Sequence, residues 1–416
     1  MKAYRKIINI SSIVFLLTLV IFYGYRLIYY YKLEHQPNGN IPVPLYQKLI
    51  NNKGIEGTNY GLLKDEKGYI FGSKSTDNYL YYVGRLWRII GIDENNNIKL
   101  ITDDGQTILT WEENTSFKAS NIYTWLNSSD TINSGIFEKS LKETISSNVK
   151  INDAYISILD QDEFEKIGSN SYLVDGTNFW INGDTRKYVN SKGEITTDAN
   201  DYDAFNVRPV IVLNSSYNYI SGNGTKESPY IIYAPYKEQL SSAYVGEYIK
   251  YNNQLWRIID ASDNIKVALE GYIEVDNNFS DKSNVINDIE GIGSYLNNEY
   301  YETLENNDYI TENNYYVGSF NDNNSYSYLN TYNNDVLLHI GLPQIGDFFI
   351  SSYDDYYTLT PSKDSSSTIY VINKNKRLFA DFITEKYKIR PVLYLNKDIF
   401  ILNGDGTKTS PYEVGR

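Results

Sequence analysis

Two stretches of this 416-residue chain close with the same phrase, and this repetition limits the possible folds more than any other feature. NVRPVIVL (206–213) is followed by SGNGTKESPYII (221–232), and KIRPVLYL (388–395) is followed by LNGDGTKTSPYEV (402–414). In both copies the arginine stands 16 positions before the second glycine of the turn (224 − 208 and 406 − 390). Repetition at a fixed spacing indicates one folded unit that is used twice.

An opening phrase repeats as well, as GRLWRIIGID (84–93) and NQLWRIIDAS (253–262). We therefore expect two modules, the first half (residues 61–235) and the second half (236–416). Each opens with two strands joined by an Asn/Asp-rich turn and closes with the Arg-Pro-Val strand. Apolar residues between these strands recur at helical spacing, so the pattern predicts an α+β fold.

Three segments carry the helical spacing. A short helix is expected at 161–167, with Asp160 and Glu163 as a capping box and Gly168 at its end. The other two helices are expected to present these apolar faces: Phe137, Leu141 and Ile145 in the first half, and Ile289, Ile292, Leu296, Tyr300 and Leu304 in the second half.

Charge and residue usage exclude several classes of function. The net charge is −14, and no basic stripe appears, so a nucleic acid is not an expected partner. The chain has no cysteine, which excludes disulfides, thiolate metal sites and cysteine nucleophiles. His35 and His339 are its two histidines, too few for a histidine-built metal site. We expect no metal and no cofactor.

The N-terminal region predicts attachment to a membrane. Residues 7–25 are uncharged and mostly apolar. This segment is long enough for a membrane-spanning helix. The basic residues of segment 1–6 would keep that segment in the cytoplasm. Residues 26–60 would form a juxtamembrane segment and linker, with both modules outside the cell. Cleavage of the apolar segment at an unrecognised site is the alternative.

Several motifs resemble the formylglycine-generating-enzyme family and related bacterial surface modules of the C-type-lectin-like fold. LPQIGDF (342–348) is similar to that family's Leu-Pro-Thr-x-x-Glu-Trp segment, and each Arg-Pro-Val strand resembles its terminal strand. YYTLTPSKDSSSTIYVINKNK (356–376) resembles a phrase that precedes the last strand of the surface modules. The resemblance implies tandem cell-surface modules of low-GC Gram-positive bacteria, in a fold often used for binding. The oxidase activity does not carry over, because the chain lacks the cysteines on which it depends.

Two sets of residues are candidates for a role. The repeat signature is expected to be structural, with core tryptophans and with arginines paired to carboxylates or backbone carbonyls. Its members are Trp87, Arg88, Arg208, Pro209, Trp256, Arg257, Arg390 and Pro391. The second set could stack on a sugar or peptide, with core packing as the alternative. Its members are Trp111, Trp125, Trp180, Tyr356 and Tyr357.

Together these patterns predict a membrane-anchored extracellular binding protein, an adhesin or envelope receptor, that recognises a glycan or protein ligand through two C-type-lectin-like modules. We expect no enzymatic activity. A structural or assembly factor of the cell envelope is the first alternative. An extracellular hydrolase that uses paired carboxylates is the second, because 52 acidic residues allow many pairs.

The residue usage predicts that folding needs neither a disulfide nor a transition metal. Reductant and chelator should each leave the melting temperature unchanged within error. A loss of several degrees with chelator alone would instead show that oxygen ligands in the Asn/Asp-rich loops hold calcium.

Overall fold

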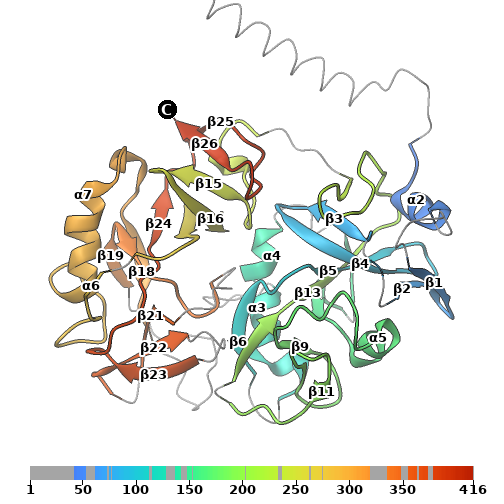
Figure 1. The fold of residues 1–416 in the computed structure, drawn as a ribbon, viewed down its shortest axis with the longest axis horizontal. Coiled ribbons are helices and arrows are strands. Elements are labelled where there is room, and N and C mark those ends of the chain that lie inside the picture. The colour runs from blue at the N-terminus through green and yellow to red at the C-terminus, as the bar shows by residue number, and fades with distance from the viewer. Residues whose placement is uncertain are drawn as a thin grey trace, which may run out of the picture. The chain divides into compact units, whose positions relative to one another are not determined.

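The computed structural model divides the chain into two compact units, Met1–Val43 and Pro44–Arg416. The structure describes residues 42–52, 61–72, 75, 77–111, 115–127, 136–141, 148–151, 153–201, 203–232, 237–261, 264–273, 275–318, 335–347, 355–362, 365–372 and 378–415. Every described helix and strand belongs to the second unit (Figure 1).

β-Structure dominates the described residues, of which 39% lie in strands and 15% in helices. The predicted class, α+β with an N-terminal transmembrane helix before the modules, was therefore wrong. The physical reason is that the helical spacing extends over only short segments between strands, so it produces brief helices rather than a helical layer. In the part of the chain that the structure describes, no helix is long and apolar enough to span a membrane. Segments 1–6 and 7–25 and most of 26–60 lie outside the described residues.

Two sheets build the first half. The larger has the order β1-β2-β4-β5-β13-β7, with β3 on β4, β14 on β3 and β8 on β13; the smaller has the order β11-β10-β9-β12-β6. The strands are β1 (Leu62–Asp65), β2 (Gly68–Phe71), β3 (Tyr79–Tyr82), β4 (Arg85–Asp93), β5 (Ile98–Thr102), β6 (Thr107–Thr110), β7 (Asn148–Val149), β8 (Ser157–Ile158), β9 (Phe179–Ile181), β10 (Lys187–Val189), β11 (Ile195–Thr196), β12 (Ala204–Val207), β13 (Pro209–Leu213) and β14 (Tyr230–Ile231). The helices are α2 (Leu45–Asn51), which precedes the half, then η1 (Phe117–Ala119), α3 (Asn121–Leu126), α4 (Ile136–Ser140) and α5 (Gln161–Ile167).

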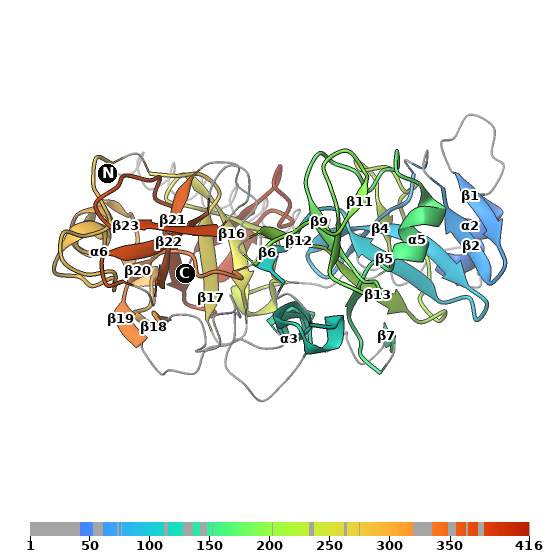
Figure 2. The ribbon, with the colours of Figure 1, turned by 90° about the horizontal axis from the view of Figure 1, so that it is seen from below.

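The second half has a seven-stranded sheet, β20-β24-β17-β16-β15-β26-β25, and two small sheets, β18-β19 and β21-β22-β23. The strands are β15 (Tyr248–Tyr251), β16 (Gln254–Asp260), β17 (Ile265–Leu269), β18 (Asn313–Tyr316), β19 (Asp335–Leu338), β20 (Ile340–Gly341), β21 (Tyr356–Pro361), β22 (Thr368–Ile372), β23 (Leu378–Phe382), β24 (Val392–Leu395), β25 (Phe400–Asn403) and β26 (Tyr412–Gly415). The helical segments are η3 (Leu240–Ser242), α6 (Gly291–Ser294), the π-helix η4 (Tyr295–Tyr300), α7 (Tyr301–Thr303) and η5 (Asn307–Tyr309). Each described sheet draws its strands from one half alone, as Figure 2 also shows.

The same strand order recurs at the centre of each half. The opening strand β4 pairs with β5, and β5 with the closing strand β13; likewise β16 pairs with β17, and β17 with β24. The opening and closing strands of each half therefore belong to one sheet, as the repeated phrases predict. The tryptophan of each opening strand is fully buried, and its ring N–H donates to a carbonyl five residues earlier: Trp87 to Tyr82 at 2.9 Å and Trp256 to Tyr251 at 3.1 Å.

The helical segments agree with the sequence only in part. Helix α5 occupies the predicted residues and ends at Gly168, whose φ of 102° disfavours other residues. Its N-terminal Asp160 makes no side-chain cap and instead accepts a hydrogen bond from the Asn182 side chain at 2.8 Å. In the second half the helical run begins only at Gly291, so Ile289 is 84% exposed rather than part of an apolar face.

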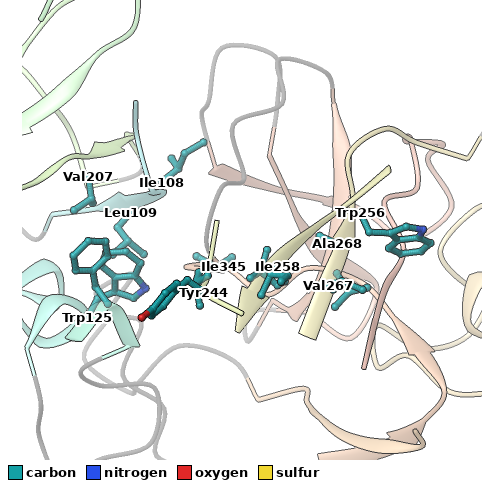
Figure 3. Packing of buried hydrophobic residues seen from close by; sticks show 14 of the residues in the cluster. Ile108, Leu109, Trp125, Val207, Tyr244, Trp256, Ile258, Val267, Ala268 and Ile345 are labelled. Atoms are coloured by element: carbon teal, nitrogen blue, oxygen red, sulfur yellow. The ribbon is translucent and has the colours of Figure 1, made fainter. Parts of the chain in front are cut away.

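The two halves share one apolar cluster. Figure 3 shows Tyr244 and Ile345 of the second half between Trp125 of the first half and Ile258 of β16, and all four side chains are buried. The turn between β3 and β4 packs tightly against Tyr244. A Cβ atom on Gly84 would lie 2.5 Å from the Cβ of Tyr244, so only glycine fits there.

Polar groups at the same boundary are paired. Arg85 donates from Nη2 to the carbonyl of Val245 at 3.1 Å and to the Ser140 hydroxyl at 3.0 Å. The carboxylate of Glu247, which is 1% exposed, accepts from the Tyr244 backbone N–H at 2.8 Å and forms an ion pair with Lys237. Removing either partner of such a buried pair is strongly destabilising, because it leaves the other charge unpaired.

Trp256→Ala should lower the free energy of unfolding by about 3–5 kcal/mol, because it removes a fully buried indole and leaves a cavity that the surrounding sheet cannot close. Chemical denaturation of the full chain, followed by far-ultraviolet circular dichroism, measures the change. Phe382→Ala is the control, because Phe382 is 59% exposed and should cost little. Equal losses in the two variants would contradict the role of Trp256 in the core.

Candidate functional site

All five aromatic residues considered for ligand stacking are buried, each with an exposed fraction of 0%. Trp111 and Trp180 lie in one aromatic cluster with ring centroids 5.7 Å apart, and Trp180 also contacts Phe205 at 4.8 Å. Their ring nitrogens donate within the first half, Trp180 to the Leu109 carbonyl at 2.7 Å. Core packing, the alternative considered from the sequence, describes these positions.

The other three candidates are also engaged inside the protein. The Trp125 ring N–H donates to the Gly346 carbonyl at 2.8 Å, so this residue joins the two halves of the chain. The Tyr357 hydroxyl donates to the Glu385 carbonyl. The Tyr356 ring lies 5.4 Å from the guanidinium carbon of Arg390, one of the repeated arginines.

The first of the repeated arginines, Arg208, links separate segments of the first half. Arg208, 1% exposed, donates to three carbonyls: Thr102 at 2.8 Å, Asp103 at 2.9 Å and Leu173 at 2.7 Å. This confirms the expected pairing of a buried arginine with backbone carbonyls. Pro209 and Pro391 directly follow Arg208 and Arg390 and are buried; Pro209 begins β13, and Pro391 directly precedes β24.

The arginines that follow the opening tryptophans pack on tyrosines. The guanidinium of Arg88 lies 3.8 Å from the ring centre of Tyr79, and that of Arg257 lies 5.1 Å from Tyr248. Arg88 is 3.8 Å from a carboxylate oxygen of Asp103 in its own half. Arg257 is 3.8 Å from Asp104 across the boundary between the halves. The two copies of one sequence phrase therefore make different contacts.

The segment Leu342–Asp347 forms the centre of the boundary. Its Asp347 accepts from the Lys266 ammonium at 2.8 Å and from the Gln344 backbone N–H at 2.8 Å. Its own carbonyl accepts from the Thr107 hydroxyl at 2.9 Å. Burial by itself lowers the pKa of Lys266, but the charge of Asp347 outweighs this and holds that pKa above its ordinary value.

The first half contains an equivalent pair, Lys99 and Glu163. Lys99 lies opposite Val212 and Lys266 opposite Tyr394, and each of these partners stands three positions after the proline (212 − 209 and 394 − 391). The acids match as well. Ser157 of β8 pairs with Val210, and Glu163 stands six positions after Ser157 (163 − 157). In the same way Gly341 of β20 pairs with Val392, and Asp347 stands six positions after Gly341 (347 − 341).

The two pairs differ in their surroundings. In the second half the side chains of Lys266 and Asp347 are 5% and 10% exposed, and the Asp347 carbonyl accepts a hydrogen bond from Thr107 of the first half. In the first half Lys99 and Glu163 are 21% and 28% exposed. The chain therefore uses one copy of the pair at an internal boundary, whereas the other copy is partly exposed and borders a cavity.

Two cavities of about 220 Å³ each are lined by the two ends of segment 157–163, one by Ser157 and the other by Glu163. The aromatic cavity is lined by Ser116, Phe117, Lys118, Tyr123, Ile151, Ala154, Ile156, Ser157, Asn182 and Gly183. The charged cavity is lined by Asp65, Lys67, Tyr69, Ile70, Ile90, Gly91, Ile92, Asp93, Lys99, Glu163, Lys166 and Ile167. We take these two cavities of the described residues as candidate sites.

Sequence reasoning missed both cavities, although a signal was present. The phrase Asn-Ile-Lys occurs at 97–99 and again at 264–266, each time in the strand after the opening tryptophan. A repeated lysine in an otherwise apolar strand predicts a buried or bound partner. The side chains of the aromatic cavity come from separate elements, and no spacing in the sequence connects them.

The known proteins give no further guide to these sites. No protein-family model, no curated protein and no solved structure matches the chain. The resemblance to C-type-lectin-like modules stays a prediction. Within the described ranges, no group of three or more His, Asp or Glu side chains is placed to hold a metal ion.

Alkaline pH should destabilise the protein before it ionises its buried tyrosines. Burial raises the pKa of Tyr248, Tyr300 and Tyr357 to about 12, whereas an unfolded tyrosine ionises near pH ~10. Above pH ~10 the unfolded chain binds fewer protons than the native state, so the free energy of unfolding falls as pH rises. Below pH ~10 this contribution to stability is fully present. Urea midpoints at increasing pH, with tyrosinate absorbance on the same samples, measure this. A midpoint that stays constant through pH ~11 would contradict it.

Proposed function

We propose that this chain is a non-catalytic binding protein that holds a sugar unit of a glycan in the aromatic cavity. The observation that carries the proposal is the composition of that cavity, two aromatic rings beside hydroxyl, amide and ammonium groups. A sugar offers an apolar face and polar edges, and such a lining complements both. The volume of about 220 Å³ suits one small unit of a larger ligand.

The rings that form the aromatic wall are fixed in place. Phe117 and Tyr123 lie edge to face with centroids 5.5 Å apart, and Trp111 supports Phe117 from behind at 6.1 Å. The Ser120 hydroxyl donates to the Phe117 carbonyl at 2.7 Å and accepts from the Tyr123 backbone N–H at 3.2 Å. One buried serine thus orients the backbone of both rings, and a wall fixed before binding loses little entropy when a ligand arrives.

Polar side chains stand around these rings. Asn182 donates from its side-chain amide to Asp160 at 2.8 Å, which fixes the orientation of that amide. Ser116 and Lys118 are exposed at the cavity mouth. Hydrogen-bonding groups of this kind give orientation and specificity to a ligand that the aromatic wall binds through its apolar face.

The lining favours binding over hydrolysis. Glycoside hydrolysis uses two carboxyl groups that flank the scissile bond. The described lining of the aromatic cavity contains no Asp, Glu or His. The role of an envelope assembly factor stays the alternative, and the location outside the cell stays a prediction from the sequence.

Binding to an immobilised panel of neutral and amino-sugar oligosaccharides tests the proposal. The native chain should bind at least one member. Tyr123→Ala should weaken that binding at least tenfold, about 1.4 kcal/mol, through loss of the aromatic wall. Tyr295→Ala is the matched control, because this half-buried tyrosine belongs to η4 of the second half, and it should bind like the native chain.

Circular dichroism should show that both variants remain folded. The proposal fails if the native chain binds no member of the panel, or if folded Tyr123→Ala binds as tightly as the native chain.

A further inference from the structure

We infer that the charged cavity is a second binding site, and that it takes a small zwitterion with an aliphatic body, such as a free amino acid. The cavity lies between β2, β4 and α5, and its volume is about 220 Å³. None of its lining residues lines the aromatic cavity, so the two sites are distinct.

The charges of the lining balance. Lys67, Lys99 and Lys166 face Asp65, Asp93 and Glu163 around one space. A ligand with a net charge would upset this balance, whereas a zwitterion adds none. Three lysines also oppose a divalent cation, which prefers a site with an excess of oxygen ligands.

Most of these charged groups already have partners. Lys166 lies 3.0 Å from Asp65. The carboxylate of Asp93 accepts from the backbone N–H groups of Asn95 and Asn97, each at 2.8 Å, and from the Asn97 side chain at 2.9 Å. Lys99 forms an ion pair with Glu163 through Oε1.

Two groups have no protein partner among the described residues. The exposed Lys67 has no hydrogen-bond or ion-pair partner there, and the Oε2 atom of Glu163 is buried without a donor. A buried acceptor without a donor is costly and seldom persists. The ammonium of a zwitterion would donate to Glu163, and its carboxylate would pair with Lys67.

The second half shows what completes the acceptor. There the equivalent carboxylate, Asp347, receives the Lys266 ammonium on Oδ1 and the Gln344 backbone N–H on Oδ2. In the first half the lysine is present, but the second donor is missing. The terminal torsion of a glutamate is broad and nearly free, so Glu163 can turn its second oxygen toward a donor that enters the cavity.

The remaining walls determine the body of the ligand. Ile70, Ile90, Ile92 and Ile167 line the cavity beside these charges. Aliphatic walls favour an aliphatic body by removing it from water. An ammonium at Glu163, a carboxylate at Lys67 and a branched carbon chain between the isoleucines describe an amino acid such as leucine.

Titration of the full chain with L-leucine, followed by calorimetry and by the melting temperature, tests the inference. Leucine should raise the melting temperature of the native chain, because it binds only the folded state. Glu163→Gln and Lys67→Ala should each weaken binding at least tenfold. The matched controls are Glu299→Gln and Lys250→Ala, exposed positions in the second half, and they should bind like the native chain.

Two analogues separate the two ends of the ligand. Leucinamide lacks the carboxylate and 4-methylpentanoate lacks the ammonium, so each should bind at least tenfold more weakly than leucine. The inference is overturned if leucine up to about 20 mM has no effect on the native chain. It is also overturned if both folded variants bind leucine normally, or if either analogue binds as well as leucine. Oligosaccharide binding by Glu163→Gln should be unchanged, so failure here leaves the glycan proposal to its own test.

Discussion

The buried ion pair between Lys266 and Asp347 is the interaction on which the arrangement of the two halves depends. It holds the segment Leu342–Asp347 so that the carbonyls of Gly346 and Asp347 meet donors from Trp125 and Thr107. A buried charge is tolerated only when its hydrogen-bonding capacity is filled, and Asp347 has a donor on each carboxylate oxygen. Ile345, in the same segment, continues the apolar cluster from one half to the other (Figure 3).

The same chemistry has a different use in the first half. Lys99 and Glu163 occupy equivalent positions, but among the described residues no donor reaches the second carboxylate oxygen, and the pair borders a cavity. A repeated unit carries the same pair in both halves, and only the copy in the second half, Lys266 and Asp347, lies at the boundary between them. The partly exposed copy borders the charged cavity, where we have proposed a binding site.

Several features of the fold could be predicted from particular residues. The pairing of Arg208 with carbonyls, the extent of α5 and the joining of opening and closing strands all follow from local rules on burial, capping and repetition. The predicted α+β class was wrong, because spacing shows which residues share a face but not how far a helix extends. Ile289 fits the helical spacing and is nevertheless exposed, since the helix begins two residues later at Gly291.

The sequence by itself determined that one sheet pattern occurs twice, with a buried tryptophan and an arginine strand in each copy, because these depend on residues that repeat at fixed spacings. Tertiary structure alone decided which copy of each phrase is covered. Trp125 is buried because a carbonyl of residue 346 completes its hydrogen bond, and Phe117 and Tyr123 line a cavity because Ser120 orients both. Such contacts join residues that are distant or irregularly spaced in the chain, and their energy comes from burial and hydrogen-bond completion, which no local pattern in the sequence encodes.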